Sequence, residues 1–82
     1  MGEMTLKTRK SSVVVTNPTH LAVALYYKEE ETPLPLVMAK GRDQQAYQMV
    51  RVARASGIPV MQNVQLARDL MASAEVDQYI PA

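Results

Sequence analysis

The stretch that decides the fold is Val13 to Leu25, with the sequence VVVTNPTHLAVAL. Two apolar runs flank four residues of turn composition, Asn17 to His20. Valine side chains are stiff about their first torsion angle and therefore favour extended strands. The pattern predicts a strand over 12–16, a tight reversal, and a second strand over 21–27. A helix is possible for the second run, but its short length and the turn before it favour a strand.

Downstream of this hairpin, short apolar runs alternate with helical patterns. Residues 28–35, KEEETPLP, are expected to form a charged loop, because each proline removes a backbone donor and enforces an extended path. Residues 36–39 and 58–61 are predicted to form two further short strands. A helical pattern over 44–56 lies between them, and this order is typical of a crossover that makes the two strands parallel.

The predicted helices have their own start and stop signals. Asp43 and Asn63 are the expected N-caps, and Gly57 is expected to end the first helix in a left-handed conformation. The apolar stripes, at spacings of three and four residues, are Ala46, Met49, Val50 and Ala53 in the first helix and Leu66, Ala67, Leu70 and Met71 in the second. The strands are too uniformly apolar to leave a sheet face in water. We therefore expect an α/β fold, with a small mixed central sheet of about four strands flanked by helices.

The composition excludes several classes of function. A chain of 82 residues makes one domain at most, and a net charge of +1 gives no reason to expect nucleic-acid binding. Without cysteine, the chain has no disulfide, thiolate metal site or cysteine nucleophile. With a single histidine as well, we expect no metal site and no cofactor. No apolar run approaches the roughly 18 residues that a membrane span needs.

The dipeptide Asn17-Pro18 offers an unusual reaction. Pro18 has no backbone N–H, so ordinary deamidation, in which the following backbone nitrogen attacks the asparagine side chain, is closed. The remaining route is attack of the Asn17 side-chain nitrogen on its own main-chain carbonyl carbon. This forms a succinimide, expels the proline nitrogen and cuts the chain. Because both reacting groups belong to one residue, good alignment lowers the barrier substantially.

His20 is a candidate helper for this reaction. It follows Asn17 by three residues, and a histidine can exchange protons near neutral pH, as the departing proline nitrogen requires. The developing oxyanion also needs a hydrogen-bond donor. The alternative is structural: Asn-Pro commonly opens turns, and an isolated short motif has a high false-positive rate. The tetrapeptide alone does not decide between these interpretations.

The surrounding sequence adds a resemblance. Residues 17–20, NPTH, lie between two apolar runs and are followed by the collinear segments ETPLPLV, SGIPVMQN, LARDL and VDQYIPA. Over residues 7–82 the chain resembles the cytoplasmic domain of the FlhB/YscU family of type III secretion export-apparatus switch proteins. The segments SSVVV and LYYKEEETPLPLV look more like the injectisome branch than the flagellar one.

The resemblance implies a domain organisation and a location. Residues 1–10 would be the end of a linker that follows a missing transmembrane part. Residues 11–82 would be the switch domain, a small α/β unit that is truncated at its C-terminus, since relatives usually have a further helix. The domain would lie at the cytoplasmic face of the bacterial inner membrane, attached to the membrane only through the missing N-terminal part.

The resemblance also implies a chemistry. The bond between Asn17 and Pro18 would break spontaneously by asparagine cyclisation, with Thr19 shaping the turn and His20 assisting proton transfer. This would be a single-turnover self-reaction, distinct from multi-turnover catalysis. The two fragments would stay associated, because residues 12–16 remain a strand of the sheet.

The implied role is a switch in export specificity, from early needle, rod or hook subunits to later substrates. The expected partners are export substrates, the length-control (ruler) protein and other components of the export apparatus. We expect the surface around the turn to be recognised, with a basic patch at positions 40, 42, 51 and 54 extending it. An uncleaved interaction module, in which NPTH is only a turn, is the competing interpretation. A conventional hydrolase is excluded, because no carboxylate–histidine or glycine-rich site is present.

Overall fold

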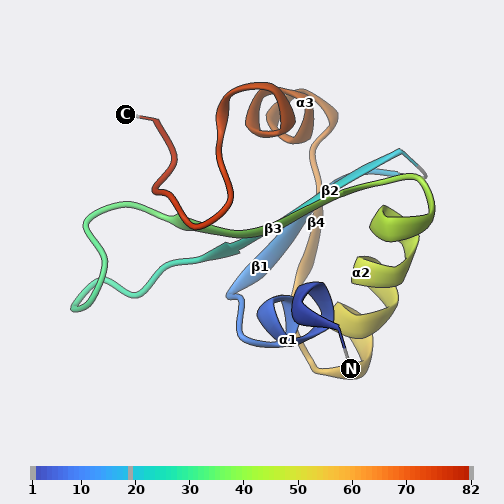
Figure 1. Ribbon diagram of the computed structural model, residues 1–82, viewed down its shortest axis with the longest axis horizontal. Coiled ribbons are helices and arrows are strands. Elements are labelled where there is room, and N and C mark those ends of the chain that lie inside the picture. Colours follow the sequence, from blue (N-terminus) through green and yellow to red (C-terminus); the bar gives the residue numbers. More distant parts are fainter. Residues whose placement is uncertain (1, 19, 82) are drawn as a thin grey trace.

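The computed structural model describes residues 2–18 and 20–81. Met1, Thr19 and Ala82 lie outside the described residues. The elements, in chain order, are α1 (Glu3–Arg9), β1 (Val13–Asn17), β2 (Leu21–Tyr26), β3 (Leu36–Arg42), α2 (Gln44–Ala55), β4 (Val60–Gln62) and α3 (Val64–Ser73) (Figure 1). All the strands and both long helices are predicted correctly to within a few residues.

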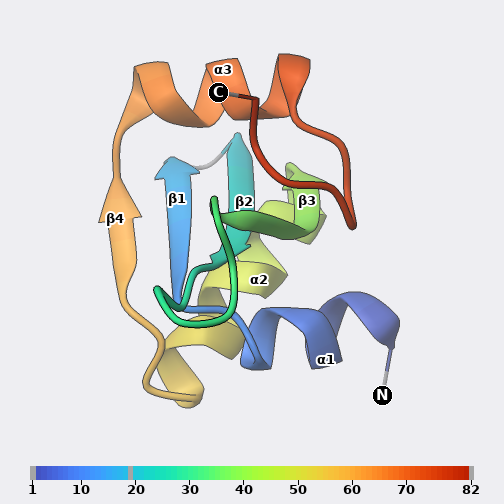
Figure 2. The ribbon, with the colours of Figure 1, turned by 90° about the vertical axis from the view of Figure 1, so that its left-hand side faces the viewer.

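The four strands form one mixed sheet in the order β3-β2-β1-β4 (Figure 2). β1 pairs antiparallel with β2 and β2 antiparallel with β3, whereas β1 pairs parallel with β4. The predicted α/β fold with a mixed four-strand sheet is therefore confirmed. β3 and β4 run in the same direction, as predicted, but they lie at opposite edges because the β1–β2 hairpin occupies the space between them.

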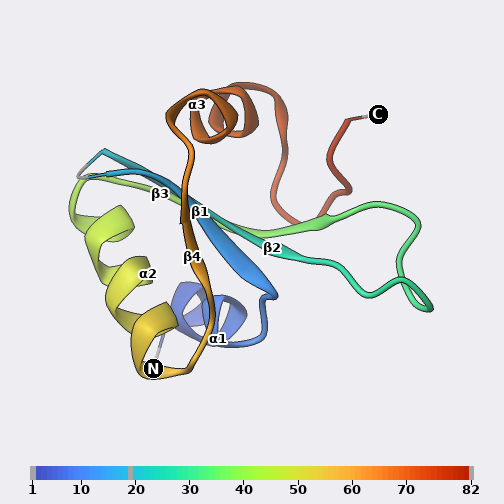
Figure 3. The ribbon, with the colours of Figure 1, turned by 180° about the vertical axis from the view of Figure 1, so that it is seen from behind.

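Helices cover both faces of the sheet. α1 and α2 lie on one face and α3 on the other (Figures 1 and 3). Alternation along β1 divides its side chains between two cores: Val14 packs toward α2, and Val15 packs toward α3. Both valines are fully buried, because β1 lies between two other strands and is covered by helices on both faces of the sheet.

The three predicted helix ends lie at the predicted residues, and two of them make the expected contacts. The Leu66 N–H donates to the Asn63 side chain at 3.0 Å, which caps α3. After α2, Gly57 has a φ of +74°, and the N–H of Ile58 donates to the Ala53 carbonyl at 2.8 Å. A glycine in this left-handed position lets the chain turn back and satisfies the last helical carbonyls.

Asp43 occupies the predicted N-cap position of α2, but its side chain does not cap the helix. Asp43 does precede α2, but its φ is 50° and its ψ is −114°, and its side chain makes no capping hydrogen bond. An N-cap residue normally has extended backbone, which aims its side chain at the free N–H groups of the first turn. At Asp43 the backbone instead turns sharply out of β3 and into α2.

The segment at 1–10, expected to be a linker, contains a folded helix. α1 packs against α2 and β3, and Thr8 is fully buried. Lys7 forms an ion pair with Asp77 and a second, 3.4 Å long, with Glu3. The hydrogen bond to Asp77 is the main cause of a raised pKa for the Lys7 ammonium. The assignment of residues 1–10 to a linker stays a prediction.

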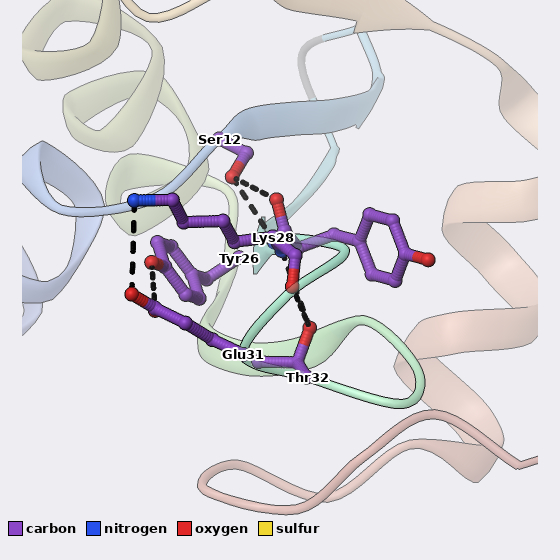
Figure 4. Close-up of polar contacts among 6 residues, drawn as sticks. Ser12, Tyr26, Lys28, Glu31 and Thr32 are labelled. Atoms are coloured by element: carbon purple, nitrogen blue, oxygen red, sulfur yellow. Dashed lines mark hydrogen bonds and ion pairs between the residues drawn. The ribbon is translucent and has the colours of Figure 1, made fainter.

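The charged loop after β2 is ordered by local polar contacts (Figure 4). The Tyr26 hydroxyl donates to a Glu31 carboxylate oxygen at 2.7 Å, and Lys28 lies 3.7 Å from the other oxygen. The hydroxyl lowers the pKa of Glu31 more than any other neighbour does. The Thr32 hydroxyl accepts a hydrogen bond from the N–H of Lys28 at 3.2 Å, closing the loop.

None of the described helices is long and apolar enough to cross a bilayer.

Candidate self-cleavage site

The motif singled out from the sequence lies in the turn between β1 and β2. Asn17 is the last residue of β1 and pairs with Leu21, the first residue of β2. Pro18 and His20 are both exposed in the reversal between them. The predicted turn is confirmed, and the Asn17–Pro18 bond lies at its start.

Main-chain hydrogen bonds hold this turn at two points. The His20 N–H donates to the Asn17 carbonyl oxygen at 3.0 Å. The His20 carbonyl oxygen in turn accepts from the Asp43 N–H, also at 3.0 Å. The Asn17 carbonyl is the group that cyclisation would attack, so a donor already lies on the oxygen that would become negatively charged. Such a preplaced donor stabilises the transition state of acyl transfer.

A cleft of about 310 Å³ opens beside the turn. It lies between the ends of β1 and β4 on one side and α2 on the other. Its lining residues are Thr16, Asn17, Pro18, Leu21, Ala46, Tyr47, Val50, Arg54, Val60 and Gln62. Both residues of the predicted scissile bond therefore form part of the wall of a largely apolar cleft.

The structure divides the predicted basic patch. Arg54 lines the cleft, and the Arg51 guanidinium lies 5.8 Å from the centre of the Tyr47 ring, over its face. Lys40 belongs elsewhere: its ammonium donates to the Ala74 carbonyl at 2.7 Å and so holds the C-terminal end of α3. A cation at that end of a helix is favourable because unpaired carbonyls gather there. Arg42 is exposed at the end of β3.

Three of the four predicted site residues are brought together in the turn: Asn17, Pro18 and His20. Thr19, whose predicted role is to shape the turn, lies outside the described residues. Across residues 2–18 and 20–81 no side-chain hydrogen bond involves Asn17 or His20. Over the same residues, no three histidine or carboxylate side chains gather where they could hold a metal ion.

Sequence reasoning missed the part that Asp43 plays at this site. The sequence predicts only a helix cap at Asp43, whereas in the structure its main-chain N–H bonds to the turn. Tyr47 and Gln62, which line the cleft beside the scissile bond, were also missed. No sequence signal points to these residues, because the contacts join segments that lie far apart in the chain.

Comparison with known proteins identifies the family. A family model described as the FlhB HrpN YscU SpaS Family matches residues 1–82. The chain belongs to this family. It is 50% identical over 74 residues to the Yop proteins translocation protein U of Yersinia pestis. The matched residues cover 90% of this chain and 21% of that protein. It is 38% identical over 81 residues to the flagellar biosynthetic protein FlhB of Bacillus subtilis, covering 99% of this chain and 22% of that protein. The chain thus spans about a fifth of the length of these relatives.

Solved structures of the family have the same fold. A mutated form of the EscU C-terminal domain superposes with a TM-score of 0.93 at 43% identity, covering all of this chain and 82% of that one. The cytoplasmic domain of FlhB from Shewanella putrefaciens superposes with a TM-score of 0.88 at 35% identity, covering 95% of this chain and 60% of that one. The family is that of the type III export apparatus, and this chain is similar to its C-terminal domain.

Proposed function

We propose that the chain is a self-cleaving switch domain of a type III export apparatus, which cuts itself between Asn17 and Pro18. The observation that carries the proposal is the 3.0 Å hydrogen bond from the His20 N–H to the Asn17 carbonyl oxygen. It supports attack at this carbonyl in particular, because the following residue is a proline and deamidation is closed. Membership of the export-apparatus family supports the same conclusion.

The reaction needs no reagent from outside the chain. The Asn17 side-chain nitrogen bonds to the Asn17 carbonyl carbon, and negative charge develops on the oxygen that accepts from the His20 N–H. The bond from that carbon to the Pro18 nitrogen then breaks. One proton leaves the attacking nitrogen and one is taken up by the Pro18 nitrogen, with the His20 imidazole as the proposed carrier. The products are fragment 1–17, ending in a succinimide, and fragment 18–82, beginning with a free proline amine.

The cut changes the surface while the fold is retained. β1 pairs with a strand on each side, so fragment 1–17 stays in the sheet after cleavage. The new ends at Asn17 and Pro18 alter the wall of the 310 Å³ cleft. We propose that export substrates, the ruler protein or other components of the apparatus distinguish the two forms here, and that export then passes from early to late substrates.

The proposed setting is the cytoplasmic face of the bacterial inner membrane, with membrane attachment through a part of the protein that precedes this chain. The injectisome branch is favoured over the flagellar one. Identity is 50% to the relative named for translocation of Yop proteins, against 38% and 46% to the flagellar FlhB proteins of Bacillus subtilis and Helicobacter pylori.

The test is the mass of the denatured protein, compared with an Asn17→Ala variant. Cleavage by cyclisation predicts two fragments whose masses sum to that of the intact chain, or to one water more once the succinimide has hydrolysed. A contaminating protease would always add water and would leave no succinimide form. The variant should stay intact. A single wild-type chain after long incubation at neutral pH would reject self-cleavage and leave the uncleaved interaction module.

A further inference from the structure

The corner between β3 and α2 holds the reactive turn through the main chain. Arg42, the last residue of β3, is in register with Leu21, the residue after the motif. The next residue, Asp43, donates its N–H to the His20 carbonyl at 3.0 Å. His20 is therefore held on both sides, since its own N–H donates to the Asn17 carbonyl oxygen. One chain of hydrogen bonds connects the corner to the oxygen of the scissile peptide.

The backbone of Asp43 is strained. A φ of 50° with a ψ of −114° is a conformation that residues with a side chain rarely adopt, and only glycine adopts it without cost. Capping does not explain it, because the Asp43 side chain makes no capping hydrogen bond. Strain of this kind persists where the surroundings enforce it, and it gathers at functional sites.

The surroundings that enforce this conformation can be identified. Gly41 lies so close beneath α2 that an added Cβ would be 3.1 Å from the Ala46 nitrogen and 2.8 Å from the Met49 sulfur. α2 therefore starts almost on top of the end of β3, and the connection must turn within a single residue. The Asp43 carbonyl is also engaged, because it accepts from the Tyr47 N–H at 3.0 Å. The sharp turn directs the Asp43 N–H away from the helix and toward His20.

We propose that Asp43 is a positioning residue for the cleavage reaction. Its main-chain N–H fixes the His20 peptide, so that the His20 N–H stays on the Asn17 carbonyl oxygen as negative charge develops there. The inference rests on the proposed self-cleavage. It assigns the role to the backbone conformation at position 43, so the rate of cleavage depends on which conformations the residue permits and is independent of the carboxylate.

A substitution series separates conformation from charge. Asp43→Gly keeps the N–H and removes the strain, and Asp43→Asn keeps a residue that tolerates positive φ but removes the charge. Both should cleave within about twofold of the wild-type rate. Asp43→Val resists positive φ strongly and should pull the N–H away from His20. It should slow cleavage about tenfold, the factor expected for losing one hydrogen bond and the alignment it provides.

The rate is measured on newly made protein, so that the proposed cleavage is followed from its start. Each chain is produced by cell-free translation, synthesis is stopped, and the intact fraction is followed by denaturing mass spectrometry. Val37→Ala is the matched control: it opens a small cavity in the core facing α3, where β3 pairs with Leu25 at the end of the hairpin away from the turn, and it should lower stability without slowing cleavage. The same position 43 substitutions are combined with Asn17→Ala to record thermal unfolding and the hydrogen exchange of the residue 43 amide.

The outcomes are distinct. Slow cleavage by Asp43→Val, with a folded Asn17→Ala counterpart whose residue 43 amide has lost its protection, supports the positioning role. Equal rates for Asp43→Val and wild type would overturn it while leaving self-cleavage intact. Slowing by Asp43→Asn would assign the effect to the carboxylate and overturn it as well. A wild-type chain that never cuts would refute self-cleavage, and the positioning role with it. If Asp43→Val does not fold, the milder Asp43→Ala takes its place, with a slowing of about threefold expected.

Discussion

Replacing Val15 with alanine tests whether β1 holds together the two fragments that the proposed cleavage would produce. Val15 is fully buried in the core between the sheet and α3, and it belongs to a strand that is paired on both sides. The substitution removes two methyl groups from this core and leaves a small cavity. The expected cost is about 2 kcal/mol.

The same cost should be observed in two different ways. In the uncleaved Asn17→Ala protein, Val15 and the rest of the sheet belong to one chain, so the melting temperature should fall by about 8–16 °C. In the cleaved protein, fragment 1–17 is held without a covalent bond, so the same 2 kcal/mol should weaken its association by about 30-fold. Its melting temperature should also rise with concentration, because unfolding then separates two chains.

The assay is gel filtration of the cleaved proteins over a hundredfold range of dilution, with thermal unfolding recorded at each concentration. Val64→Ala is the control, because it removes the same atoms from a side chain that is 43% exposed. It should change neither fragment retention nor melting temperature appreciably. If cleaved Val15→Ala protein retained its fragment as tightly as wild type, or if the melting temperature of both were independent of concentration, β1 would not be what joins the fragments.

Other predictions concern single contacts. Gly41→Ala should lower the free energy of unfolding by about 1–3 kcal/mol in urea titrations, because the new Cβ meets the Ala46 backbone nitrogen at 3.1 Å; an unchanged value would mean that α2 can move away freely. Asn63→Ala should lower the melting temperature by about 4–8 °C through loss of a cap worth about 1 kcal/mol, and a smaller shift would argue against the cap. Glu31 has a lowered pKa, so its contribution to stability is present above the unfolded pKa and is lost as the pH falls through the folded one. Tyr26→Phe should raise the Glu31 pKa toward its ordinary value in an NMR titration, and no change would remove the hydroxyl as the cause.

Local sequence signals predicted most of the fold. The three valines at 13–15, the turn residues after them and the apolar run at 21–26 predict a hairpin from local signals, and the structure has it. The caps at Asn63 and Gly57 were predictable for the same reason: each acts on backbone groups within a few residues. The strand order was not predictable in this way. The order depends on which strands pair although they lie far apart in the chain. The β1–β2 hairpin lies between β3 and β4, the two strands that α2 connects.

The missing side-chain cap at Asp43, which holds the predicted N-cap position, has a different physical origin. Aspartate before a helical pattern normally caps the helix, and that preference is local. Here the close approach of α2 to Gly41 leaves room for only one abrupt residue between β3 and α2, and the extended backbone needed for capping is lost. Tertiary packing overrides the local preference. The cost of the strained backbone is offset by the packing of α2 on the sheet.

Tertiary packing also limits how much of the site can be predicted from the sequence. The tetrapeptide at 17–20 contains the proposed attacking nitrogen, its carbonyl target and the leaving group, so the reaction could be proposed from residue types alone. The His20 N–H reaches the Asn17 oxygen only in this turn conformation. Asp43, which follows β3, holds the turn through its main-chain N–H. Asn-Pro sequences commonly open turns, so the dipeptide alone does not specify this second support. The tetrapeptide therefore supplies the reacting groups, whereas the fold around it sets the rate of the proposed cleavage. The substitutions that tune the rate should therefore include positions such as Asp43, which lie outside the motif.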